Sequence, residues 1–76
     1  MRFLTRRDDN KFILLRDGTI EKIEWIYVVN WNPLRLGLRT EIDGKTLYRT
    51  YTGRGKTKSD SSEKDIIQIS PINLWN

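Results

Sequence analysis

Apolar and polar residues alternate most strictly in the middle of the chain, over residues 34–42. One phase is apolar or β-branched and the other is mostly polar: the first comprises Leu34, Leu36, Leu38, Thr40 and Ile42, and the second Arg35, Gly37, Arg39 and Glu41. Asp43-Gly44 follows, and residues 45–52 form a second run rich in threonine and tyrosine. Alternation on both sides of an Asp-Gly pair predicts a β-hairpin closed by a two-residue type I′ turn.

The two-residue turn also fixes the register of this hairpin. The register gathers polar side chains on one face, with Arg39 opposite Tyr48, Gly37 opposite Thr50, Arg35 opposite Thr52, and Arg54 and Lys56 just beyond. On the other face, Thr40 pairs with Leu47 and Arg49 lies opposite Leu38. Burial of the Arg49 charge on an apolar face would be unfavourable. We therefore expect either a bulge there or a guanidinium that extends to water.

A second strand is predicted over residues 19–29, which are rich in β-branched and aromatic side chains. A helix would also fit the spacing of its first isoleucines, but this composition favours a strand. Ile20 is out of phase with the later apolar residues, which predicts a bulge near Glu21-Lys22. The side chains expected on the buried face are Ile23, Trp25, Tyr27 and Val29, with Trp25 in the core.

Shorter elements are predicted on either side of these strands. Residues 2–5 and 11–15 are apolar runs separated by a turn-rich segment, and Asp17-Gly18 is another hairpin signal. Residues 53–64 are polar and predict a long loop, and residues 65–70 form a last strand.

The fold class follows from this succession of short strands and turns. We expect a single domain over residues 1–76, with five or six short antiparallel strands and a 3₁₀ turn, capped by Ser62, before the last strand. In so small a chain, this organisation predicts an all-β, SH3-like or OB-like, partly open barrel.

The composition argues against catalysis. The chain has no cysteine and no histidine, which removes disulfides, Cys and His metal ligands and every nucleophile pair that relies on histidine. Gly53-Arg54-Gly55-Lys56-Thr57 resembles the end of a phosphate-binding loop, but Thr50 stands where the first glycine is required. We interpret the carboxylates as solvated loop charges and caps, namely Asp8, Asp9, Asp60, Glu63 and Asp65. We expect a non-enzymatic protein that needs no cofactor and no metal.

The net charge of +4 is concentrated in residues 35–58, where seven basic and two acidic residues give +5. Guanidinium groups bind phosphate in a bidentate manner, and a tyrosine ring offers a surface on which a nucleic acid base can stack. The alternative is an ordinary solvated sheet face on which Arg39 packs across Tyr48. The candidate binding residues of this region are Arg35, Arg39, Tyr48, Arg54, Lys56 and Lys58.

Two further tryptophans are candidate binding residues. Trp31 lies between asparagines in a connection, where we expect it to be exposed. Trp75 belongs to the uncharged tail of residues 71–76, which also contains Ile72 and Leu74. We expect this tail to fold back over the open end of the barrel, and the alternative is an exposed anchor for a homodimer or a protein target.

The order of several motifs over residues 31–67 is similar to that of small uncharacterised β-proteins encoded by phages and prophages. The motifs are Asn32-Pro33-Leu34-Arg35-Leu36, Asp43-Gly44, Tyr51-Thr52-Gly53-Arg54-Gly55 and Asp65-Ile66. The resemblance implies a phage accessory protein that blocks a host enzyme or a defence system by binding to it.

Two function hypotheses follow. The first is a phage-encoded binding protein that inhibits a host protein with an acidic surface, through the basic segment and Trp31 or Trp75. The alternative is a small barrel that binds nucleic acid on its basic and aromatic face. The longest apolar run is too short to cross a bilayer, and Arg6-Arg7-Asp8-Asp9 interrupts any apolar segment of a signal peptide. We therefore expect a cytoplasmic protein without membrane partners, in the host cell if it is phage-encoded.

Overall fold

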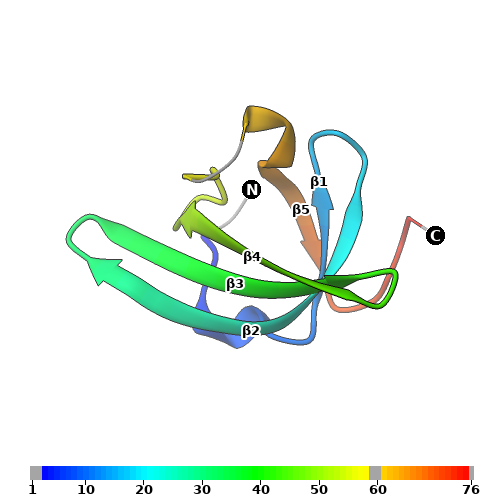
Figure 1. Ribbon diagram of the computed structural model, residues 1–76, viewed down its shortest axis with the longest axis horizontal. Helices are drawn as coiled ribbons and strands as arrows, with labels where there is room; N and C mark the ends of the chain where they lie inside the picture. The colour runs from blue at the N-terminus through cyan, green and yellow to red at the C-terminus, as the bar shows by residue number, and fades with distance from the viewer. Residues whose placement is uncertain (1–2, 59–60, 76) are drawn as a thin grey trace.

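A curled antiparallel sheet, with the strand order β4-β3-β2-β1-β5, makes up most of the computed structural model (Figure 1). The structure describes residues 3–58 and 61–75. The elements are the 3₁₀ turn η1 (Arg6–Asp8), β1 (Phe12–Leu15), β2 (Ile20–Trp31), β3 (Leu34–Ile42), β4 (Lys45–Thr52), the 3₁₀ turn η2 (Ser62–Lys64) and β5 (Ile66–Ser70). This confirms the all-β prediction. A meander of four strands is followed by a 3₁₀ turn and by a strand that returns to pair with β1.

The β3–β4 hairpin has the predicted turn and register. Asp43 and Gly44 both have positive φ angles, of 49° and 77°, as a type I′ turn requires. The pairing runs without interruption from Ile42 opposite Lys45 to Arg35 opposite Thr52. Local sequence was therefore sufficient to set the relative position of these two strands.

The prediction for β2 was wrong in its phase. Glu21 and Lys22 pair regularly with β1, and the irregularities lie further along, between Ile23 and Trp25 and between Val28 and Asn30. The extra residue at each place, Glu24 and then Val29, reverses which side of the sheet the following side chains occupy. The side chains that face the interior are Ile23, Ile26 and Val28, whereas Trp25 and Val29 are each 52% exposed.

The core is made of aliphatic side chains from β1, β2, β3 and β5, of Leu4, and of one tyrosine from β4. Its buried members are Leu4, Ile13, Leu15, Ile23, Ile26, Leu36, Leu38, Tyr51 and Ile66. Leu4 reaches this core without belonging to a strand, because its backbone N–H donates to the carbonyl of Gly53 at 2.6 Å. Residues 3–5 lie outside the strands and are held against the sheet by this hydrogen bond.

The turn after residue 5 is a capped 3₁₀ turn. Thr5 is its N-cap: the Thr5 Oγ1 accepts from the N–H of Arg7, and the Thr5 N–H donates to a carboxylate oxygen of Asp8 at 2.9 Å. Asp8 is fully buried and pairs with Lys11 at 3.0 Å. Asp8 is thus one of the caps that the sequence predicted, although it lies in the interior and not in solvent.

The segment after β4 joins the two edges of the sheet. Thr57 forms a bridge with Tyr51, and its N–H donates to Asp65 Oδ1 at 2.9 Å. The carbonyl of Gly55 accepts from the N–H of Ile66, the first residue of β5, at 2.8 Å. Residues 53–58 of the predicted long loop therefore form a seam that partly closes the barrel. The following 3₁₀ turn has Ser61 at its N-cap instead of Ser62 and no side-chain cap.

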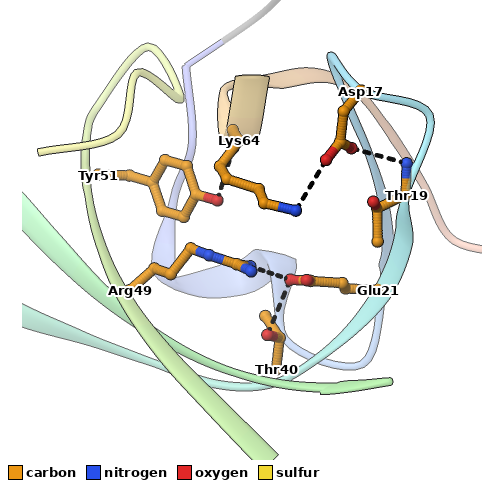
Figure 2. Close-up of polar contacts among 7 residues, drawn as sticks. All are labelled: Asp17, Thr19, Glu21, Thr40, Arg49, Tyr51 and Lys64. Atoms are coloured by element: carbon orange, nitrogen blue, oxygen red, sulfur yellow. Dashed lines mark hydrogen bonds and ion pairs between the residues drawn. The ribbon is translucent and has the colours of Figure 1, made fainter. Parts of the chain in front are cut away.

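An ion pair inside the sheet accounts for the arginine on the apolar face (Figure 2). Arg49 donates to Glu21 Oε1, which also accepts from the hydroxyl of Thr40 at 2.9 Å. Both charged side chains are nearly excluded from water, with 9% of the Arg49 side chain and 1% of that of Glu21 exposed. Neither the bulge nor the snorkelling that the sequence suggested occurs at Arg49.

A second set of polar contacts links the 3₁₀ turn η2 to β4 and to the β1–β2 turn (Figure 2). The ammonium group of Lys64 donates to Asp17 in the β1–β2 turn at 2.7 Å, and the Tyr51 hydroxyl donates to the Lys64 carbonyl at 2.8 Å. The hydrogen bond from Lys64, aided by that from the N–H of Thr19, holds the pKa of the Asp17 carboxyl well below its usual range. These contacts fasten β4, η2 and the β1–β2 turn together.

We expect Gly44→Val to destabilise the protein by more than about 1 kcal/mol, because a β-branched residue is strained at positive φ. Thermal denaturation followed by circular dichroism measures this. Thr46→Val, at an exposed strand position in the same hairpin, is the matched control and should leave the midpoint nearly unchanged. An unchanged midpoint for Gly44→Val would contradict the role of the turn.

We expect Arg49→Met to cost about 3–5 kcal/mol, because it leaves the Glu21 carboxylate buried without its cation. The double variant Glu21→Leu/Arg49→Met removes both charges and should recover most of that loss. Urea denaturation of the two single variants and the double variant measures the coupling. A loss below about 1 kcal/mol for Arg49→Met would show that the pair contributes little.

Candidate functional site

The outer face of β2, β3 and β4 carries an exposed group of aromatic and cationic side chains. The β2–β3 register places Trp25 beside Arg39, and the β3–β4 register places Arg39 beside Tyr48. In the next row, Tyr27, Gly37 and Thr50 lie side by side. Trp25 is 52% exposed and Tyr48 is 63% exposed, so both rings present surface to solvent.

Arg39 stacks on the first of these aromatic rings. Its guanidinium carbon lies 5.5 Å from the centroid of the Trp25 ring, and its Nε lies 3.8 Å from a carboxylate oxygen of Glu24. The same Nε is buried and has no hydrogen-bond partner among the described residues. The guanidinium is therefore positioned by cation–π stacking and by the charge of Glu24, and not by a hydrogen bond at Nε.

Gly37 makes room for the second aromatic ring. A Cβ at this position would overlap the end of the Tyr27 ring, so the ring lies directly over the glycine backbone. Tyr27 also contacts Trp25, with ring centroids 5.2 Å apart and planes tilted by 43°. The two rings consequently form one continuous aromatic surface across β2 and β3.

Basic residues of the seam extend this surface beyond the end of β4. Thr57 pairs with Tyr51 on the interior side. Because successive residues point to opposite sides of a strand, its neighbours Lys56 and Lys58 lie on the outer side, and both are exposed. Arg35 is located on the same side, opposite Thr52.

Arg54 is the remaining basic residue of the predicted set. It is exposed and its guanidinium carbon lies 5.0 Å above the ring of Phe3. Its backbone N–H donates to the Thr52 hydroxyl at 3.3 Å, which places it at the end of β4. The structure thus brings the predicted residues Arg35, Arg39, Tyr48, Arg54, Lys56 and Lys58 to the β3–β4 hairpin and its seam.

The sequence prediction missed Trp25 and Tyr27, which the bulge at Glu24 moves from the expected core to this face. A signal was present in the sequence. Ile23, Ile26 and Val28 are aliphatic, whereas Trp25 and Tyr27 are amphipathic aromatic residues. An apolar phase made only of aliphatic residues requires an extra residue between Ile23 and Ile26.

The other two predicted binding residues lie elsewhere. Trp31 is 72% exposed, as expected, but it is the last residue of β2, paired with Leu34, and not part of a connection. Trp75 is half-buried, but its neighbours Ile72 and Leu74 are 62% and 58% exposed. The tail therefore does not close the barrel as predicted, because two of its three large apolar side chains face solvent.

Comparison of the chain with family models, with curated proteins and with solved structures gave no match. Among residues 3–58 and 61–75, no group of three or more acidic side chains is arranged to hold a metal ion. Within the same residues, none of the helical segments has the length and apolar character needed to cross a bilayer.

We expect Gly37→Ala to force the Tyr27 ring away from the sheet and to cost about 1 kcal/mol, the low end for overpacking because the ring can move into solvent. Removal of the ring in Gly37→Ala/Tyr27→Ala should eliminate the additional penalty of the alanine. Proton NMR provides the structural readout, since the ring should shift a Gly37 Hα resonance upfield in the unaltered protein only. Additive effects of the two substitutions would contradict this contact.

Proposed function

We propose that this protein binds single-stranded nucleic acid on the outer face of β2, β3 and β4, without catalysing a reaction. The observation that carries the proposal is the arrangement of Trp25, Tyr27 and Tyr48 around Arg39 on one side of an antiparallel sheet. Trp25 and Tyr27 are two residues apart on β2, and Tyr48 lies on β4 across Arg39, so the face offers aromatic rings on which unstacked bases can stack.

Exposure of these rings is the physical argument for a ligand. A tryptophan and a tyrosine that are more than half exposed leave large apolar areas in water. Base stacking on such rings contributes about 1–3 kcal/mol per base and tolerates any sequence, because each base has an aromatic face. The Arg39 guanidinium, already stacked on Trp25, adds a planar donor for a phosphate or a base edge.

The charges of the face fit a phosphate backbone. Arg35, Lys56 and Lys58 lie on the outer side at the end of β4, beyond the aromatic rows. A strand that stacks on Trp25 and Tyr48 and runs toward Thr52 would carry its phosphates past these cations. Glu24 and Glu41 lie toward the other end of the face, away from these cations.

Exposed aromatic rings favour a single strand over a duplex. Bases in a duplex stack on each other and cannot stack on Trp25 or Tyr48. Origin in a phage remains a prediction that rests on the sequence resemblance alone.

The test is fluorescence anisotropy with fluorescein-labelled dT15 and U15 at several salt concentrations. We expect binding that weakens with salt, with a slope reduced by charge reversal at Arg39, Lys56 and Lys58. Trp25→Ala/Tyr48→Ala should weaken binding by about ten-fold or more at any salt concentration. Trp31→Ala, an exposed tryptophan outside this face, is the matched control and should bind normally.

Circular dichroism of each variant establishes that the sheet is retained, since exposed substitutions usually change stability by less than about 0.5 kcal/mol. Absence of binding to both oligonucleotides at 50 mM salt would overturn the proposal. Equal affinity of Trp25→Ala/Tyr48→Ala and the unaltered protein would also overturn it, because charge alone would then explain the binding.

A further inference from the structure

A cavity of about 470 Å³ opens on the inner side of the β2–β3 hairpin, next to η1. This hairpin projects beyond the rest of the sheet, at the left of Figure 1. The lining of the cavity includes the apolar Leu4, Val28, Trp31, Leu34 and Leu36 and the basic Arg6 and Arg7. We refer to this hollow as the hairpin cavity. Its volume lies in the range of pockets that hold small molecules or several protein side chains.

The second bulge of β2 creates one wall of the hairpin cavity. Val28 faces the interior, and the extra residue at Val29 reverses the phase so that Trp31 lies on the same side as Val28. Trp31 pairs with Leu34 across the end of the hairpin. Trp31 is 72% exposed and Leu34 is 37% exposed, so apolar surface around the cavity remains open to solvent.

The charge at the cavity is of one sign. Arg6 and Arg7 contribute to its lining, and none of the lining residues among those the structure describes is acidic. Neither guanidinium forms an ion pair with any residue that the structure describes. An occupant that fills the apolar part therefore gains further by placing a carboxylate beside these arginines.

We propose that the hairpin cavity is a docking site for a segment of a partner protein, in which an acidic residue lies next to a large apolar side chain. A tryptophan and two arginines around an apolar hollow are the residue types that dominate the affinity of protein interfaces. A second copy of this chain is a poorer occupant, because its exposed apolar tail, residues 71–75, carries no acidic residue. The proposal does not depend on the nucleic-acid face, which uses other residues.

The test is selection from a displayed library of random 12-residue peptides. The library is first depleted on the variant Trp31→Ala/Leu34→Glu and then selected on the unaltered protein. We expect enriched peptides to carry Asp or Glu within three positions of Leu, Ile, Phe or Trp. Synthetic copies should lose affinity by about ten-fold or more for Arg6→Glu/Arg7→Glu, because the rim charge is then repulsive.

Two controls separate the possible outcomes. Trp25→Ala, on the opposite face, should bind the selected peptides normally, and Trp31→Ala alone replaces the double variant if the latter fails to fold. The proposal is overturned if no peptide survives depletion, or if the enriched peptides lack acidic residues. It is also overturned if sedimentation shows that the unaltered protein is a dimer that Trp31→Ala dissociates, since the occupant would then be a second copy.

Discussion

The extra residue at Glu24 decides which side of the sheet each later residue of β2 occupies, and much of the molecule depends on that choice. Because side chains alternate with a period of two, one inserted residue exchanges the two faces beyond it. Ile26 thereby joins Ile23 in the core, and Trp25 joins Arg39 outside. Without the bulge, the tryptophan would lie in an interior that this small sheet fills with aliphatic side chains, and the outer face would lose its largest ring.

The interior shows how a chain of this size accommodates charge. Glu21, Thr40 and Arg49 come from three adjacent strands, and Glu21 Oε1 accepts hydrogen bonds from the other two side chains (Figure 2). A buried pair of this kind gives little net stability compared with apolar side chains of similar volume, but either charge alone would be costly. The pair therefore makes β2 and β4 depend on each other, since a displaced register would leave both groups without a partner.

Sequence patterns were sufficient to predict those parts of the fold that are formed by residues close together in the chain. Alternation and Asp43-Gly44 specified the β3–β4 hairpin and its register, and thus the face that holds Arg39 and Tyr48. The position of Trp25 could not be obtained in this way, because a bulge is stabilised by packing between strands and leaves only a change of phase in the sequence. The partner of Arg49 is 28 residues away, and the hairpin cavity joins η1 to the end of a distant hairpin, so neither follows from neighbours along the chain.

The β2–β3 hairpin is one sheet thick, and chain neighbours within it alternate between its two surfaces. Tyr27 belongs to the aromatic face and Val28 to the cavity, and Gly37 and Leu36 are divided in the same way. Two ligands held on these surfaces would be separated by little more than the backbone of a strand pair. Under both proposals, the protein would act as a bridge between a nucleic acid strand and a protein segment. The effective concentration of one ligand near the other would be in about the millimolar range. A small domain could in this way recruit a partner to nucleic acid without a second domain or a linker.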